Sequence, residues 1–100
     1  MAELLMLEFD GIGEKEYLAV NAELGIDAET GEGDWPAGLV THLGSVDDGG
    51  SLHVIEVWDS HEDQEKFMHG RLGAALAAGG ITAAPKVTWT HLIGHQNPGL

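Results

Sequence analysis

The chain has 100 residues and no cysteine, which is enough for one domain with a modest core and no disulfide to stabilise it. Seventeen Asp and Glu residues against four Lys and Arg give a net charge of −13, which disfavours nucleic acid and anionic membranes as partners. No apolar run approaches the roughly 20 residues of a membrane span, and the start of the chain lacks the basic segment of a signal peptide, so we expect a cytoplasmic location.

The first two expected elements are a strand and a helix. The apolar run from Leu4 to Phe9 ends at an Asp-Gly pair and favours a buried strand. Residues Glu14 to Leu24 predict an amphipathic helix that Gly25 ends. Four side chains share its inward face, at the spacing i, i+3, i+4 and i+7: Tyr17, Val20, Asn21 and Leu24.

A polar, glycine-rich segment, residues 26–38, follows the helix and predicts a long loop. Loops of this length inside a compact domain often carry function. Trp35 is the large apolar side chain in this segment. It serves either as a lid over an apolar pocket or as a simple hydrophobic anchor.

The next two strands are expected at Leu39–Leu43 and Leu52–Trp58, joined by a turn at residues 47–50 whose Asp-Gly pair suits a hairpin. Ser60, with an acid three residues later, then marks the start of a second helix. That helix is expected as one piece from His61 to Ala78, where a Gly-Gly pair follows it.

Pro85 precedes the last expected strand, Lys86–Ile93, and residues 95–100 have the composition of a free or docking tail. The element order is β-α-β-β-α-β, the arrangement of a ferredoxin-like α+β domain, here spanning residues 1–94. Neither face of the second, third and fourth strands alternates cleanly between apolar and polar residues. Both sheet faces are therefore expected to be at least half buried, which predicts a homodimer.

Several stretches resemble a known superfamily. They are Gly38-Leu-Val-Thr-His42, the Asp48-Gly-Gly turn, Val54-Ile-Glu-Val-Trp58-Asp-Ser60 and a helix that contains Phe67. Together they resemble the dimeric α/β-barrel superfamily and are most similar to the small proteins grouped with the antibiotic-biosynthesis monooxygenases. The resemblance implies a barrel built by two protomers, with a pocket between the sheet and helices of each.

Two branches of that superfamily have motifs that this chain does not keep. The haem-degrading branch uses a Trp and a His where this chain has Phe67 and Ala77. The plant-type cyclase branch carries His-Pro-x-His where this chain has the run His69-Gly70-Arg71-Leu72. A shared fold does not fix a reaction, so neither activity is carried over.

Six histidines offer proton-transfer chemistry near neutral pH. His42, His53 and His91 lie mid-strand and are the candidate catalytic residues, with His42 foremost because it lies in the segment that carries the resemblance. For each, the alternative is a hydrogen-bonded or interface histidine. A zinc site would require all three to converge with a carboxylate such as Glu56. We expect no metal and no cofactor, since no nucleotide-binding motif is present.

The residues expected to line a substrate pocket are Tyr17, Asn21, Trp35, Trp58, Phe67 and Trp89. For Trp58, a structural role at the junction between strand and helix is the stronger alternative. The resemblance to the superfamily, taken together with these residues, leaves two functions open. One is a cofactor-independent enzyme, monooxygenase- or cyclase-like, acting on a small aromatic or polyketide-like molecule. The other is a non-catalytic homodimeric module that binds a small apolar ligand or has a structural role.

Overall fold

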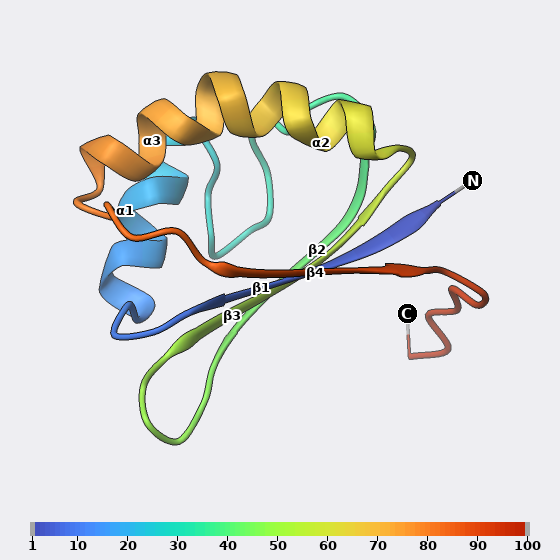
Figure 1. Ribbon diagram of the computed structural model, residues 1–100, viewed down its shortest axis with the longest axis horizontal. Helices are drawn as coiled ribbons and strands as arrows, with labels where there is room; N and C mark the ends of the chain where they lie inside the picture. Colours follow the sequence, from blue (N-terminus) through green and yellow to red (C-terminus); the bar gives the residue numbers. More distant parts are fainter. Residues whose placement is uncertain (1, 100) are drawn as a thin grey trace.

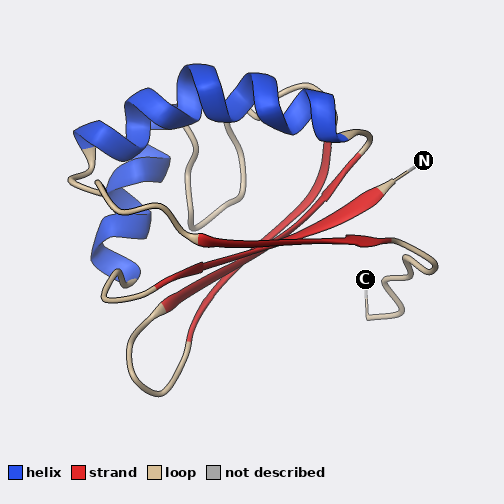
Figure 2. Cartoon of the chain, viewed as in Figure 1, coloured by secondary structure: helices blue, strands red, loops and turns tan. Residues whose placement is uncertain are grey.

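A computed structural model describes residues 2–99 and shows a four-stranded antiparallel sheet with a layer of helices on one face (Figures 1 and 2). The elements in chain order are β1 (Glu3–Phe9), α1 (Glu14–Leu24), β2 (Leu39–Val46), β3 (Leu52–Trp58), α2 (His61–Phe67), the π-helical turn η1 (Met68–Leu72), α3 (Gly73–Ala78) and β4 (Lys86–His91). The strand order is β2-β3-β1-β4, and every neighbouring pair is antiparallel. This confirms the expected ferredoxin-like α+β fold.

The core lies between the inner face of the sheet and the helices. Alternate residues of β1 point into it, because successive side chains of a strand face opposite sides. The same alternation places Leu52, Val54 and Trp58 of β3 on the inner face. The buried apolar cluster that results contains Leu5, Leu7, Phe9, Val20, Leu24, Ile26, Leu52, Val54, Trp58, Phe67, Ala75 and Ile81.

Helix α1 has the bounds and the inward face that its sequence predicts. Val20, Asn21 and Leu24 are buried against the sheet. At its start, the Glu16 carboxylate accepts a 3.1 Å hydrogen bond from the N–H of Gly13. At its end, Gly25 adopts a φ of 75°, a left-handed conformation that glycine takes without a steric penalty.

The expectation of one regular helix from His61 to Ala78 is wrong in detail. Ser60 does begin it, since its hydroxyl accepts a hydrogen bond from the N–H of Asp63. The helix is then interrupted by η1, in which Gly70 has a φ of −113° and a ψ of −109°. Glycine tolerates such a conformation, and π-helical turns of this kind are frequent at functional sites.

Two strand ends also differ from the expectation. β2 continues to Val46, beyond the predicted end at Leu43, because its pairing with β3 runs as far as Leu52. β4 ends at His91 instead of Ile93, since the paired part of β1 begins at Glu3. Pairing partners therefore set both ends, which the local pattern alone does not reveal.

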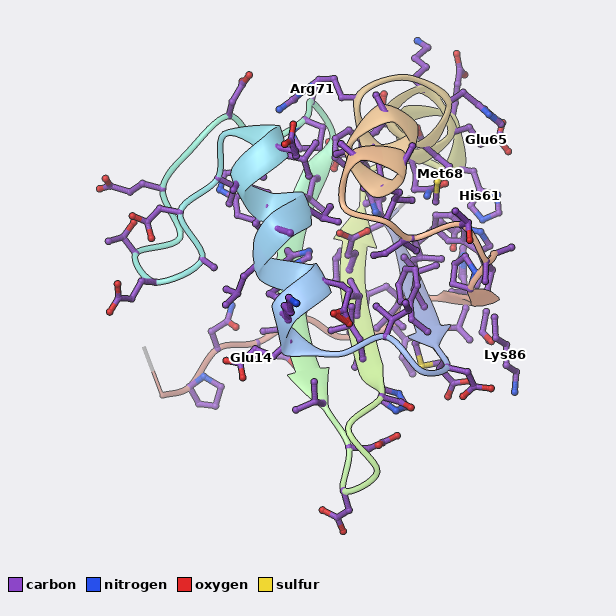
Figure 3. The ribbon with its side chains drawn as sticks, turned by 90° about the vertical axis from the view of Figure 1, so that its left-hand side faces the viewer. Glu14, His61, Glu65, Met68, Arg71 and Lys86 are labelled. Atoms are coloured by element: carbon purple, nitrogen blue, oxygen red, sulfur yellow. The ribbon has the colours of Figure 1, made fainter. Side chains whose placement is uncertain are left out.

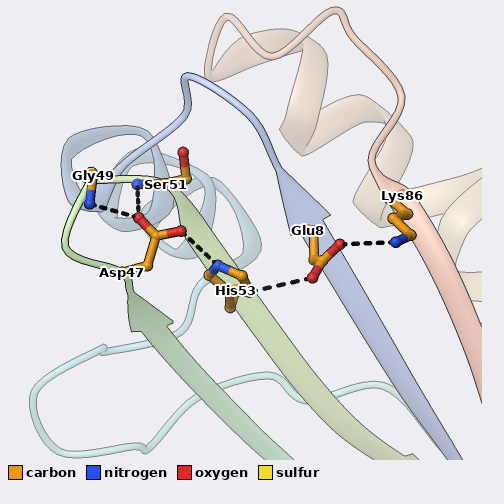
Figure 4. A network of polar contacts seen from close by, with 6 residues as sticks. All are labelled: Glu8, Asp47, Gly49, Ser51, His53 and Lys86. Atoms are coloured by element: carbon orange, nitrogen blue, oxygen red, sulfur yellow. Dashed lines mark hydrogen bonds and ion pairs between the residues drawn. The ribbon is translucent and has the colours of Figure 1, made fainter.

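The turn between β2 and β3 is organised by Asp47 (Figure 4). One carboxylate oxygen accepts hydrogen bonds from the N–H groups of Gly49 and Ser51, at 2.9 and 3.0 Å, and the other lies 2.8 Å from Nε2 of His53. The hydrogen bond to His53, followed by that from Ser51, lowers the pKa of Asp47 below its ordinary value of 3.8. His53 thus has a local structural partner on this hairpin.

The face of the sheet opposite the helices carries apolar side chains with little cover. Its partly or largely exposed members include Leu4, Met6, Leu43 and Ile55. The C-terminal tail passes below this face in Figure 1, and a hydrogen bond of 3.1 Å joins His95 to Thr41. No helix among residues 2–99 is long and apolar enough to cross a membrane.

Candidate functional site

The site lies where α1 faces the strands β2 and β3. Tyr17 and Asn21 are one turn apart on the inner side of α1, so both reach toward the sheet. His42 of β2 is the direct pairing partner of Glu56 of β3, and directly opposed residues point to the same face of a sheet. The helix and the two strands therefore bring these four side chains to one place.

A chain of hydrogen bonds crosses the inner face of the sheet at this place. The Tyr17 hydroxyl lies 2.6 Å from Nε2 of His42, and Nδ1 of His42 lies 2.7 Å from Oε2 of Glu56. The second carboxylate oxygen of Glu56 accepts a 3.0 Å hydrogen bond from the indole N–H of Trp58. Glu56 is 6% exposed and Trp58 is 0% exposed, so the inner end of this series of hydrogen bonds is shielded from water.

The direction of each hydrogen bond follows from the groups at this inner end. A carboxylate only accepts and an indole N–H only donates, so Glu56 accepts from Trp58 and from the Nδ1–H of His42. In a neutral imidazole this leaves Nε2 as an acceptor, and the Tyr17 hydroxyl donates to it. A proton can then move from Tyr17 to His42 while Glu56 stabilises the imidazolium, which is the logic of catalytic triads.

Aromatic rings hold the imidazole in position. The rings of Tyr17 and His42 are nearly parallel, with an interplanar angle of 5° and centroids 5.8 Å apart. Trp35 approaches the same imidazole at 5.2 Å with a tilt of 46°. His42 is thus restrained by two hydrogen bonds and two rings, which is the preorganisation that proton transfer requires.

The backbone of β2 approaches the Tyr17 ring closely at Gly44. A Cβ atom at this position would lie 2.6 Å from Cζ of Tyr17 and 2.7 Å from its hydroxyl oxygen. Both distances are below van der Waals contact, so any side chain at position 44 would displace the ring. The hydrogen bond between Tyr17 and His42 therefore depends on glycine at position 44.

Three spaces meet at this site. The first is an inner cavity of about 50 Å³ between helices and sheet, apolar except where Tyr17, Asn21, His42 and Glu56 border it. It has room for a few water molecules and is too small for an aromatic ring. Two larger hollows, of about 260 and 330 Å³, open beside it towards solvent. Trp35 and His42 border all three spaces, so the indole acts as the partition between them.

Asn21 contributes a polar group with no protein partner. It is 5% exposed and borders both the inner cavity and the 260 Å³ hollow. Its side-chain amide forms no hydrogen bond within residues 2–99, and since no fully buried polar side-chain atom there lacks a partner, the amide atoms must be accessible to solvent. The amide is therefore available to a molecule in the hollow.

The loop at residues 26–38 is held in a defined shape beside β2, where it appears in cyan in Figure 3. The Trp35 indole N–H donates to the carbonyl of Gly31 at 2.8 Å. From η1, Arg71, which is labelled in Figure 3, donates to the carbonyls of Leu24, at 3.0 Å, and Asp34, at 2.5 Å. The π-helical turn thus ties the end of α1 to the segment that carries Trp35.

The three predicted histidines do not converge. His53 lies three residues from Glu56 on β3 and therefore points to the opposite face, towards Asp47 and Glu8. His91 lies on β4, at the other edge of the sheet, 3.1 Å from Glu3. A zinc site built from three strands has no support in this geometry, and residues 2–99 contain no group of three His, Asp or Glu placed to hold a metal.

The predicted aromatic residues are divided in the same way. Phe67 borders the inner cavity and packs on Trp58, with ring centroids 5.9 Å apart. Trp58 itself lies behind Glu56 and reaches the site through its N–H, in keeping with a structural role at the junction of strand and helix. Trp89 lies on β4, where its ring centroid is 3.6 Å from that of His61, and it borders none of the three spaces.

Sequence reasoning assigned no catalytic role to Glu56, to which it gave only the part of a zinc ligand. One signal was available: Glu56 stands between Val54 and Trp58 at the spacing of two residues that places all three on one strand face. A carboxylate on a face that is otherwise apolar must be paired to be buried. The roles of Arg71 and Gly44 had no such local signal, because their contacts lie far away in the sequence.

Comparisons with known proteins identify the fold. No family model matches the sequence, and no curated protein is similar enough in sequence to be counted as a relative. Solved structures do match. The chain is similar to a "putative antibiotic biosynthesis monooxygenase" from Chloroflexus aurantiacus J-10-fl, with 19% identity and a TM-score of 0.67, over 99% of this chain and 100% of that one.

Two further structures are similar over nearly the whole chain. One is the NE2512 protein of unknown function from Nitrosomonas europaea, with 16% identity and a TM-score of 0.65 over 98% of this chain and 95% of that one. The other is Rv0793 from Mycobacterium tuberculosis, with 14% identity and a TM-score of 0.63 over 97% and 100%. At these identities the likeness establishes the fold, and confirms at that level the resemblance stated from the sequence.

Proposed function

We propose that this protein is a cofactor-independent enzyme that removes a proton from a small aromatic molecule. The observation that carries the proposal is the hydrogen-bonded chain from Tyr17 through His42 to Glu56, which ends at the edge of a hollow large enough for one ring. The similar Chloroflexus aurantiacus structure, a "putative antibiotic biosynthesis monooxygenase", supports chemistry of this kind.

The reaction begins with transfer of a substrate proton to the Tyr17 oxygen as the tyrosine proton passes to Nε2 of His42. Glu56 then stabilises the imidazolium through Nδ1. The substrate anion, a phenolate or its carbanion form, has two outcomes. It reacts with O₂ to give a hydroperoxide that loses water to form a carbonyl, or it attacks a carbonyl of its own and closes a ring.

The size of the site favours a small substrate. Typical ligand sites enclose about 300–1,000 Å³. The hollow beside Tyr17 and His42 has about 260 Å³, and the inner cavity behind it adds only about 50 Å³. A molecule with a single ring fits this space. A larger polyketide-like molecule requires Trp35 to move from its place between the hollows.

Carbon–hydrogen exchange tests this proposal. Resorcinol and cyclohexanone, incubated with the protein in D₂O, are expected to exchange ring or α protons for deuterium faster than in buffer, as followed by proton NMR. Tyr17→Phe is expected to lower the protein-dependent rate by a factor of about 10²–10⁴, the usual contribution of a positioned acid or base. Leu18→Met, on the exposed side of the same helix, serves as the control and is expected to leave it unchanged.

A non-catalytic binding module is the second candidate, and the small size of the inner cavity favours it. This function predicts that a probe shifts the NMR signal of the Trp35 indole without any exchange of its carbon-bound protons. Exchange that Tyr17→Phe leaves intact would likewise contradict the assigned role of the tyrosine.

The chain is further proposed to work as a homodimer through the open face of the sheet. The support is the group of exposed apolar side chains on that face, of which Leu43 is 58% exposed. Light scattering is expected to give twice the 10.6 kDa of one chain, and Leu43→Lys is expected to give the monomer mass. Leu18→Lys, at a leucine 47% exposed on α1, is the matched control and is expected to stay dimeric. A monomeric wild-type protein at micromolar concentration would overturn the proposal.

A further inference from the structure

The 260 Å³ hollow beside Tyr17 has an unbalanced charge. Its lining contains one ionised side chain, Asp27, and no Lys or Arg. Oδ1 of Asp27 accepts hydrogen bonds from the N–H groups of Glu29 and Thr30, at 2.8 and 3.1 Å, while Oδ2 has no hydrogen-bond partner within residues 2–99. A carboxylate oxygen at the edge of a hollow without a counter-charge attracts a cation.

Charges around the hollow act in the same direction. The loop that forms its outer wall carries Asp27, Glu29, Glu32 and Asp34, and the chain as a whole has a net charge of −13. Arg71, which lies near this loop, has its guanidinium 3.4 Å from the carboxylate of Asp34 and bonded to two backbone carbonyls. An anionic ligand would therefore enter against repulsion, and a cationic one would be attracted.

Aromatic surface lines the same space. Tyr17, Trp35 and His42 all border the hollow, and their rings contact one another. The N–H of Trp35 is already bonded to Gly31 and the hydroxyl of Tyr17 to His42, so both rings offer a ligand mainly their apolar and π-electron surface. A ring flanked by a carboxylate is the arrangement that binds organic ammonium groups by cation–π attraction.

Asn21 provides an independent indication that this space can accept a ligand. Its amide borders the hollow and has no partner within the described part of the chain. An amide of this kind is satisfied by a ligand hydroxyl or carbonyl. The hollow thus offers a polar contact on the inner side, ring surfaces beside it and a carboxylate at Asp27.

We infer that the substrate of this site is a single-ring aromatic amine that carries a hydroxyl or carbonyl group on the ring. The inference rests on the proposed function, because it names the class of substrate that the same site accepts. Asp27 pairs with the ammonium group, Trp35 and Tyr17 contact the ring, and Asn21 bonds to the ring oxygen.

Three phenols that differ only in charge test this inference: tyramine, 4-ethylphenol and 3-(4-hydroxyphenyl)propionate. Titration into ¹⁵N-labelled protein, read at the Trp35 indole N–H signal, is expected to give a Kd for tyramine about tenfold lower than for 4-ethylphenol. The propionate is expected to bind more weakly than either. Equal affinities for the three, or no shift of the Trp35 signal, would overturn the inference.

Two variants distinguish the effect of the Asp27 carboxylate from the effect of the net negative charge of the protein. Asp27→Asn keeps an oxygen for the loop N–H groups and is expected to reduce the preference for tyramine to about threefold or less. Glu29→Gln removes the same unit of charge from a residue that does not line the hollow, and is expected to leave the preference intact. Equal loss in both variants would show that only the overall charge acts. Because the readout is binding, a preference for the amine without proton exchange would contradict the proposed enzyme and leave the aromatic amine as a ligand of the site, not its substrate.

Discussion

Replacing Glu56 by glutamine is expected to lower the turnover of any substrate of this site by a factor of about 10²–10⁴, as the loss of the orienting acid does in other triads. The carboxylate accepts hydrogen bonds from both Trp58 and His42. A glutamine has only one acceptor oxygen, so its NH₂ group must face one of these two donors. If it faces His42, the imidazole adopts the other tautomer and its Nε2–H points at the Tyr17 oxygen, which can then no longer pass on a proton.

The test is to determine kcat and KM separately for wild type and variant. The substrate is the compound whose carbon-bound protons the wild-type protein exchanges fastest in D₂O. The loss is expected in kcat, since Glu56 touches His42 and does not border the 260 Å³ hollow. Glu23→Gln, on the exposed side of α1, provides the same chemical change as a control and is expected to retain full activity. A fully active Glu56→Gln protein would remove the carboxylate from the mechanism.

Truncation of Trp58 to alanine is expected to destabilise the protein by about 3–5 kcal/mol, the usual cost of removing a fully buried aromatic side chain. Trp58 is 0% exposed and packs on Phe67. The change also leaves one oxygen of the buried Glu56 carboxylate without a donor. A domain of this size has only about 5–15 kcal/mol of stability in all, so the variant is expected to be partly unfolded at 37 °C.

Urea denaturation of three variants separates the two contributions of Trp58. Trp58→Phe keeps most of the apolar volume and loses the N–H, and is expected to cost about 1–3 kcal/mol. Trp89→Ala, at a partly exposed tryptophan on β4, is the matched truncation and is expected to cost less than Trp58→Ala. Equal costs at positions 58 and 89 would contradict the role given to burial.

The fold was predictable because its main signals are local. The period of 3.6 residues placed Tyr17 and Asn21 on the inward face of α1, and turn residues separated the strands correctly. The π-helical turn at Gly70 was not predictable, because it depends on a single residue in a sequence whose apolar pattern continues on both sides. Strand ends were set by pairing partners, which lie far away in the sequence.

The site was only partly predictable for a related reason. His42 and His53 are both mid-strand histidines, and nothing in their neighbours reveals which sheet face the helices cover. The pairing of His42 with Glu56 is a matter of register between two strands, which the sequence does not specify by itself. The position of Trp35 depends on Arg71, a residue 36 positions away. The sequence therefore showed which residue types could transfer a proton, but not which of these residues contact one another.

Gly44 constrains any redesign of this site. Its backbone has no positive φ, so neither a turn nor strand geometry calls for glycine at this position. Glycine is required here because the ring of Tyr17 occupies the space that a Cβ atom would take. Tyr17 lies 25 residues before His42, the residue to which it is hydrogen-bonded. A library that randomised β2 around a fixed Tyr17, His42 and Glu56 would lose the constellation in most members through this one position. A design that places these three side chains in another sheet must therefore also place a glycine at the position equivalent to Gly44.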